Sequence, residues 1–309
     1  MVTPELHATA PALRVLGIGM GPQHVTPEVS AALRECDQVV ALDKSAAPGA
    51  HAGREADEQL AVRRLVAEQH GVELVVVPDP PRDRDPSDYL AAVADWHRAR
   101  VERIAAALRE RGGRTALLAW GDPSLYDSMV RLAEQLAGQL GVDWDVMPGI
   151  SAPQLLAARH RIVLHRVGEP VHLTSARRLR EAVEGGQRNV VVMLGSERTL
   201  DELAGLADWQ IWWAANLGCD GERLVAGRID EVLDQVRQAR RAALEQDGWV
   251  MDIALVRAPD ESALPASPEE SAAPGGTRES AEQPVAEASV PRTHPAPGTL
   301  GASAPEERR

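Results

Sequence analysis

The sequence predicts an α/β protein with two α/β domains, a cleft between them and a disordered C-terminal tail. Short apolar runs rich in Val and Leu alternate with longer amphipathic segments over residues 13–257. The runs themselves do not alternate with polar residues, which is typical of parallel strands covered on both faces. The alternation begins again near residue 168, and two such domains would leave a cleft where ligands usually bind. The expected parts are a flexible N-terminus at 1–12, an N-terminal α/β domain at 13–167, a C-terminal α/β domain at 168–258 and a tail at 259–309.

The first domain is expected to form a doubly wound sheet, because predicted strands and helices follow one another in turn. Its strands are expected at 13–20, 38–42, 73–77, 115–120 and 144–147, and its helices at 27–35, 54–70, 87–111, 125–140 and 151–160. The second domain is expected to repeat this alternation. Its strands are expected at 170–174, 189–194, 210–215 and 249–256, and its helices at 175–184, 198–206 and 229–246.

Composition excludes several classes of protein. The net charge of −13 argues against a main role in binding nucleic acid. No apolar run approaches the ~20 residues of a membrane span, and no secretory signal opens the chain, so a cytoplasmic protein is expected. Cys36 and Cys219 are too few for a disulfide framework or a metal set, and no metal is expected. The tail holds nine prolines and no aromatic residue, a composition that predicts disorder.

A glycine-rich turn follows the first predicted strand. Residues 17–21 read GIGMG, and Thr26 with Pro27 marks the start of the next helix. Glycines there let the backbone approach a ligand closely. The dinucleotide-binding pattern G-x-G-x-x-G is one interpretation, but its third glycine would fall on Pro22, which has no N–H to offer a pyrophosphate. A purely structural turn is another.

Two further turns end predicted strands. Residues 120–126 read WGDPSLY at the carboxyl end of the fourth strand, where open α/β sheets place ligands, and residues 147–152 read MPGISA. Each alone is compatible with a simple strand-to-helix turn.

Together these turns resemble the motifs of the tetrapyrrole (corrin and porphyrin) methyltransferases, a family that uses S-adenosylmethionine. The resemblance extends over residues 13–257. Most relatives carry an aspartate after the third glycine, whereas Pro22 follows directly here. The matching segments are 17–21, 36–44, 121–126 and 148–151. Within the family the chain is most similar to the deacetylating branch, on segments 42–44, 78–80, 88–89, 95–97, 120–127 and 157–172.

The resemblance implies a homodimer with S-adenosylmethionine in the interdomain cleft. It implies that precorrin-5 is the substrate, that a methyl group is added at C-1 and that the acetyl group leaves as acetate. By position, the cofactor-binding residues would be Met20, Trp120, Gly121, Asp122, Leu125, Ser151, Ala152, Leu194 and Gly218.

Loss of an acetyl group requires a general base for water and a donor for the oxyanion. Asp43 matches the position of a proton-accepting aspartate in some relatives and is the expected base. It could instead form only local contacts, and each histidine could be structural. The candidate donors are Lys44, Tyr126, His160 and His172.

A precorrin carries many carboxylates, so an acidic protein must gather cations where the substrate binds. Basic residues cluster near the junction of the predicted domains, and arginine suits bidentate carboxylate binding. The expected substrate-binding residues are Arg159, Arg161, Arg166, Glu169, Arg177 and Arg178. Arg82 and Arg84 lie in a polar loop that could close over the substrate.

Three alternatives remain open at this point. The chain could methylate another precorrin position, or an RNA or protein. It could be a nicotinamide-dependent oxidoreductase, if the glycine-rich turn binds a dinucleotide. It could also be a non-catalytic corrinoid-binding protein, because the first loop departs from the family pattern.

Overall fold

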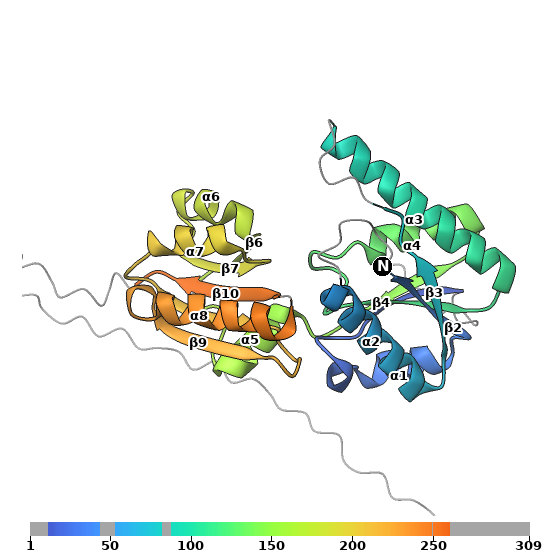
Figure 1. Ribbon diagram of the computed structural model, residues 1–309, viewed down its shortest axis with the longest axis horizontal. Coiled ribbons are helices and arrows are strands. Elements are labelled where there is room, and N and C mark those ends of the chain that lie inside the picture. The colour runs from blue at the N-terminus through green and yellow to red at the C-terminus, as the bar shows by residue number, and fades with distance from the viewer. Residues whose placement is uncertain (1–11, 44–52, 82–87, 249, 260–309) are drawn as a thin grey trace, which may run out of the picture. The chain divides into compact units, whose positions relative to one another are not determined.

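The computed structural model describes residues 12–43, 53–81, 88–248 and 250–259 (Figure 1). The chain divides into two compact units, Met1–Ala263 and Leu264–Arg309, and the second lies outside the described residues. The expected flexible N-terminus, apart from Ala12, and nearly all of the expected tail are also outside them. Both sheets of the protein belong to the first unit.

The first sheet consists of parallel strands in the order β3-β2-β4-β1-β5. The strands are β1 (Leu13–Gly17), β2 (Gln38–Asp43), β3 (Glu73–Pro78), β4 (Thr115–Ala119) and β5 (Trp144–Met147), and the helices between them are α1 (Pro27–Arg34), α2 (Gly53–His70), α3 (Tyr89–Arg111) and α4 (Met129–Leu140). This is a doubly wound sheet, as predicted. Each expected strand is present, and the first ends at Gly17 because the chain then turns through the glycine-rich segment.

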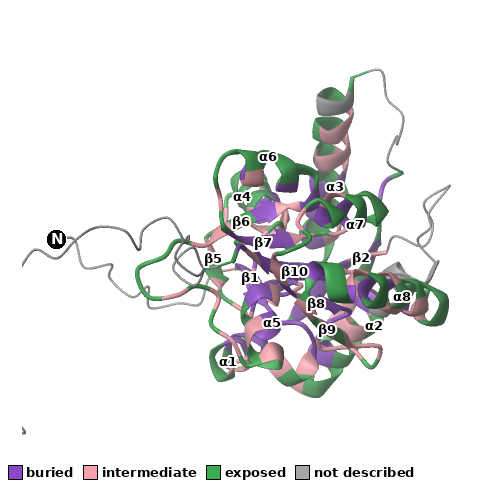
Figure 2. Cartoon of the chain, turned by 90° about the vertical axis from the view of Figure 1, so that its left-hand side faces the viewer, coloured by how far each residue is buried: buried purple, intermediate pink, exposed green. Residues whose placement is uncertain are grey.

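Two apolar clusters explain why the helices cover both faces of this sheet. On one face, Leu33 of α1 and Val66 of α2 are buried with Leu16 and Val39 of the sheet. On the other, α3 and α4 are buried against β1, β2 and β4. Figure 1 shows the two pairs of helices on opposite sides of the strands, and Figure 2 shows buried residues in the region of β1. The apolar runs of β1, β2 and β4 are therefore covered on both sides, whereas the edge strands β3 and β5 are more exposed.

The second sheet is mixed, with the order β6-β7-β10-β8-β9. β6 is parallel to β7, and the remaining neighbours are antiparallel. The strands are β6 (His172–Ser175), β7 (Asn189–Met193), β8 (Gln210–Ala215), β9 (Arg223–Arg228) and β10 (Asp252–Arg257). The helices are α5 (Ala152–His160), α6 (Leu179–Glu184), α7 (Glu197–Ala204) and α8 (Ile229–Asp247), and the short 3-10 segments are η1 (Pro22–His24) and η2 (Ala176–Arg178).

The two faces of the second sheet are covered differently. Helices α6, α7 and α8 pack on one face around the buried Trp213. On the other face, Leu155 and Leu156 of α5 join a cluster that also includes Met20 and Trp120. The turns that end β1 and β4 therefore contact the second sheet through buried apolar side chains.

Two elements differ from the prediction. β9 was not expected, because it is an edge strand whose residues alternate between partly buried and exposed and include Gly227 and two arginines. Helix α4 begins at Met129 rather than at residue 125, because Tyr126 has a φ of 51°, which a right-handed helix cannot contain. No described helix is long and apolar enough to cross a membrane.

Candidate active site

Three glycine turns of the first sheet pack backbone against backbone. Gly19 and Gly121 exchange two hydrogen bonds, with N···O distances of 3.2 and 2.8 Å. A Cβ on Gly149 would lie 2.2 Å from the Gly121 carbonyl oxygen, and a Cβ on Gly17 would lie 2.5 Å from the Gly149 nitrogen. No larger residue fits between these turns. The glycines that suggested a ligand site are therefore required first by the contact of the turns with one another.

Asp122 fastens two of these turns. One carboxylate oxygen accepts hydrogen bonds from the backbone N–H and the hydroxyl of Ser124, and the other accepts from the Gly149 N–H at 3.0 Å. Partial burial opposes ionisation of Asp122, but these hydrogen bonds outweigh it and hold the pKa of the carboxyl below its ordinary value. Asp122 thus acts within the site as a structural anion.

The second sheet contributes two turns. Leu194, directly after β7, has a φ of 61°, and its side chain is 50% exposed. Gly218 packs so closely on the first loop that a Cβ there would lie 2.2 Å from the Met20 carbonyl oxygen. The Gln23 amide donates to the Gly218 carbonyl at 2.8 Å, and the Gly218 N–H donates to Glu222 at 2.8 Å. These contacts fix the first loop against the second sheet.

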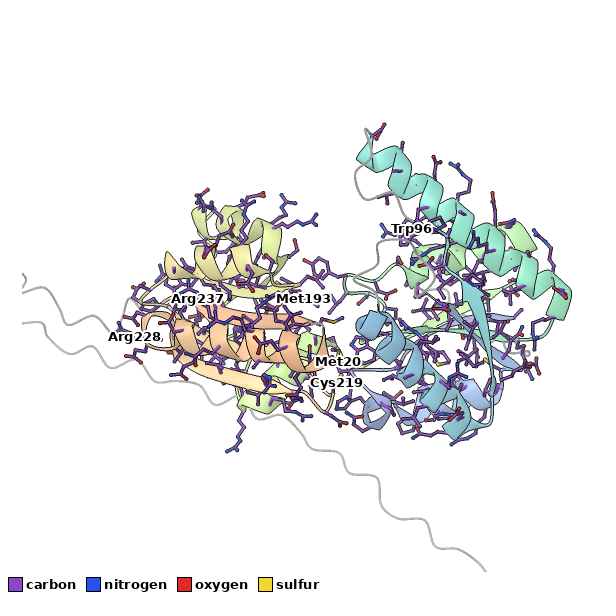
Figure 3. The ribbon with its side chains drawn as sticks, viewed as in Figure 1. Met20, Trp96, Met193, Cys219, Arg228 and Arg237 are labelled. Carbon is purple, nitrogen blue, oxygen red and sulfur yellow. The ribbon has the colours of Figure 1, made fainter. Side chains whose placement is uncertain are left out.

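These turns surround a cavity of about 240 Å³. Eight of the nine predicted cofactor-binding residues line it: Met20, Trp120, Gly121, Asp122, Leu125, Ser151, Ala152 and Leu194. The ninth, Gly218, lies behind Met20. Met193 and Met251 of the second sheet complete an apolar wall (Met20 and Met193 are labelled in Figure 3). The structure thus gathers residues that are far apart in the sequence around one space.

Trp120 places an unpaired polar atom in this wall. Its indole Nε1 is buried and has no hydrogen-bond partner among the described residues. An unsatisfied buried donor is rare in proteins and calls for an explanation, such as a bound group or water.

The expected base, Asp43, ends β2 at the rim of the cavity. Leu42 lines the cavity, whereas Asp43 is partly buried beside it. The Asp43 carbonyl accepts from the Asp79 N–H at 2.8 Å. Lys44 lies outside the described residues.

A buried ion pair supports this rim. Asp79 binds Arg100 through two hydrogen bonds, one of them 2.7 Å long, and both side chains are at most 6% exposed. The Arg100 guanidinium stacks on Trp96, 3.5 Å from the ring centroid, and the Trp96 indole donates to the Pro80 carbonyl (Trp96 is labelled in Figure 3). Segments 78–80 and 95–97, which carried the resemblance to the deacetylating branch, therefore form one cluster behind Asp43.

The candidate donors are distributed over different places. Tyr126 has a left-handed backbone, is 51% exposed, and lines both the central cavity and a neighbouring one of about 480 Å³ that contains His172. His160 lies outside the lining of both. Its Nε2 is 3.0 Å from the Trp213 carbonyl oxygen, and burial lowers its pKa despite that hydrogen bond.

The predicted substrate-binding residues do not line the central cavity. Three of the arginines form ion pairs: Arg159 with Glu222 at 2.7 Å, Arg166 with Glu169 at 3.5 Å, and Arg178 with Glu181. Arg178 also lines the neighbouring cavity beside Tyr126. Arg161, at the end of α5, and Arg177 are exposed. Arg82 and Arg84 are outside the described residues.

Among the described residues, the cations that line the central cavity are Arg63 of α2 and Arg100 of α3, neither of which was predicted. Arg63 belongs to no motif, and Arg100 follows segment 95–97 without being part of it. Only the packing of α2 and α3 over the ends of the strands brings them to the site.

Comparison with known proteins agrees with this geometry. The sequence profile of the tetrapyrrole (corrin/porphyrin) methylases matches residues 13–233, well over half of the chain. The chain belongs to this family. A precorrin-6A synthase [deacetylating] from Sinorhizobium sp. is 36% identical over 257 residues, covering 79% of this chain and 94% of the relative.

Solved structures extend the comparison. The cobalamin-synthesis-related protein CobF from Corynebacterium diphtheriae is 33% identical, with a TM-score of 0.67, 81% of this chain and 99% of that chain covered. Cobalt precorrin-4 methyltransferase CbiF shares the fold at 16% identity, with a TM-score of 0.55, covering 79% of this chain and 94% of that chain. The expected fold class and family are thereby confirmed.

Across the described ranges, which omit 44–52, 82–87 and both termini, no three His, Cys, Asp or Glu side chains are placed to hold a metal ion.

Proposed function

We propose that this methylase uses S-adenosylmethionine to convert precorrin-5 to precorrin-6A, adding a methyl group at C-1 and releasing acetate. The observation that carries the proposal is the relative named precorrin-6A synthase, which is 36% identical and is covered over 94% of its length. The clustering of branch-specific segments 78–80 and 95–97 behind Asp43 supports it.

The residues around the central cavity fit the cofactor. The unpartnered Trp120 Nε1 is a donor for an acceptor atom. Gly121 has a φ of 73°, and a Cβ there would lie 3.4 Å from Met20 Sδ, so glycine keeps its backbone open toward the cavity. Met20, Met193 and Leu194 offer apolar surface for an adenosyl group and a thioether.

When bound, S-adenosylmethionine supplies a methyl group that is already activated on a sulfonium. The protein therefore has to position two reactants and exclude water rather than provide a nucleophile. The glycine turns fix the backbone around the donor, and Asp122 keeps the turns of Gly121 and Gly149 together. Met20 and Leu194 exclude water from the apolar side.

Deacetylation needs more from the side chains. In our proposal Asp43 takes a proton from the water that adds to the acetyl carbonyl. Tyr126 and His172 donate hydrogen bonds to the oxyanion that forms there. The carbon–carbon bond then breaks, the acetyl carbon leaves as acetate, and the electron pair remains on the macrocycle. The half-exposed Tyr126 lines both the central cavity and the one that contains His172, so both donors face space beside the proposed cofactor site.

Membership of the methylase family favours this hypothesis over the nicotinamide-dependent alternative. S-Adenosylhomocysteine should quench tryptophan fluorescence through Trp120, and NADH should not. We also propose that the protein is a cytoplasmic homodimer. Light scattering during size-exclusion chromatography would test whether it is a dimer.

The decisive experiment incubates the protein with precorrin-5 and S-adenosylmethionine and measures product mass and acetate. We expect one methyl gained, one acetyl lost, and one equivalent of acetate. Methylation without acetate would assign another precorrin position. Binding of both ligands without any product would assign a non-catalytic role.

A further inference from the structure

Strands β2 and β4 separate toward their carboxyl ends. They pair only from Gln38 to Val40 and from Thr115 to Leu117, although β2 stays paired with β3 as far as Asp43. The last paired residue, Val40, and the two that follow it, Ala41 and Leu42, line the central cavity. Between two strands of a doubly wound sheet, such an opening is where ligands enter.

Arg63 of α2 extends into this opening. Its Nε donates to the Leu118 carbonyl at 3.2 Å, which satisfies a β4 carbonyl beyond the paired part of β2. Its Nη1 donates to the Gln59 carbonyl at 3.2 Å. These two bonds hold the plane of the guanidinium at the edge of the cavity.

The remaining N–H groups of Arg63 are what distinguish it from the other charged side chains of the cavity. A guanidinium has five N–H donors, and described residues accept from only two of those of Arg63. Arg100, in contrast, is neutralised by Asp79, and Asp122 is fixed by Ser124 and Gly149.

The positive charge of Arg63 is also only partly balanced by nearby groups. Burial lowers the pKa of its guanidinium, and the nearby Asp127 carboxylate offsets this only in part. Asp127 also accepts a hydrogen bond from the Met129 N–H. A bound carboxylate would supply the missing stabilisation, because charge-assisted bidentate hydrogen bonds are the strongest available to a guanidinium.

We propose that Arg63 binds a carboxylate of the tetrapyrrole substrate and so fixes how the macrocycle lies beside Asp43. This inference rests on the proposed function and names the protein group that recognises the substrate. Arg63 was not among the residues expected to bind the substrate; the expected arginines, at 159–178, do not line the central cavity. The carboxylate of the methionyl group of the cofactor has the same chemistry, so an experiment must separate the two sources.

The test measures binding of two probes to the full-length protein and its variants. The probes are uroporphyrin III, a stable macrocycle with eight carboxylates, and S-adenosylhomocysteine. The variants are Arg63→Gln, Arg63→Lys and Arg64→Gln. Arg64 is the exposed neighbour on the same helix and is the matched control.

We expect Arg63→Gln to raise the Kd for uroporphyrin III about tenfold and Arg63→Lys about threefold, because lysine keeps the charge but loses the bidentate geometry. Both variants should bind S-adenosylhomocysteine within twofold of the wild type, and Arg64→Gln should match the wild type for both probes. With precorrin-5, Arg63→Gln should raise KM more than it lowers kcat.

Two results would overturn the inference, and a third would contradict the function on which it rests. Equal uroporphyrin binding by the wild type and Arg63→Gln would mean that Arg63 serves only the Leu118 carbonyl. Weaker binding of S-adenosylhomocysteine alone would assign the carboxylate to the cofactor. Failure of the wild type to bind the macrocycle, with normal S-adenosylhomocysteine binding, would instead contradict the proposed function itself.

Discussion

The two sides of the central cavity are built in different ways. The side near Gly121 and Gly149 is made by backbone turns that touch one another directly. The side near Asp43 is made by long side chains, with Arg63 and Arg100 reaching over the strand ends from separate helices. Backbone contacts demand glycine at fixed positions, whereas side-chain contacts can be supplied from many places. The first side is therefore specified by short motifs, and the second by tertiary packing.

We expect the largest effect from a substitution on the side of the cavity that is built from long side chains. Arg100→Met leaves Asp79 as a buried, unpaired carboxylate, so the free energy of unfolding should fall by about 3–5 kcal/mol. The control is Arg98→Met, whose pair with Asp95 is more than 60% exposed on both sides and should contribute at most about 1 kcal/mol. Urea unfolding measures both. Equal effects would show that the buried pair does not support this rim.

We expect the next largest effect from a substitution on the side of the cavity that is built from backbone turns. Gly149→Ala places a Cβ 2.2 Å from the Gly121 carbonyl oxygen, which should lower stability by about 1–3 kcal/mol and weaken S-adenosylhomocysteine binding at least about tenfold. Gly138→Ala is the control, because nothing lies within 4 Å of its Cβ and a helical alanine should stabilise by about 0.5–1 kcal/mol. Calorimetry should distinguish the two variants by their stability and by their affinity for S-adenosylhomocysteine. Normal cofactor binding by Gly149→Ala would refute the importance of the close turns.

A third substitution separates chemistry from binding. Asp43→Asn should slow acetate release at least tenfold, or about 1.4 kcal/mol in the barrier, because the amide cannot accept the proton. Affinity for S-adenosylhomocysteine should be nearly unchanged, since the cofactor turns do not include Asp43. Unaltered turnover would remove Asp43 from the mechanism.

The smallest effect concerns pH. Burial lowers the pKa of His160 in the folded state, so the unfolded chain binds more protons below the ordinary value of about 6.5. The free energy of unfolding should therefore fall as the pH drops from 7 to 5. His24 shifts in the same direction.

Replacement of His160 should weaken this dependence, by less than about 1 kcal/mol for His160→Gln. Urea unfolding at pH 5, 6 and 7 measures the difference. A His160 variant with the wild-type slope would show that this group does not contribute.

The same comparison explains what could be predicted from the sequence. The doubly wound sheet and the glycine turns were predictable, because apolar runs and close backbone contacts leave a local pattern. The part of the cavity lining that was expected came from the resemblance to the family. The mixed second sheet was predicted only in part, since the edge strand β9 has alternating exposure and includes a glycine and two arginines. Arg63 was missed because nothing in its own helix marks it, and Arg100 was missed because the neighbouring segment 95–97 does not include it. The arginines at 159–178 form a visible cluster, but ion pairs with Glu222, Glu169 and Glu181 engage three of them.

We propose that one cavity receives the methyl donor among the glycine turns. A crystal structure of the protein with S-adenosylhomocysteine would show where the donor binds. We expect the adenosyl group in the cavity lined by Met20, Gly121, Ser151 and Leu194, with Trp120 Nε1 donating to the ligand or to a water bound with it. Ligand density at any other place, with these side chains packed against one another, would contradict it.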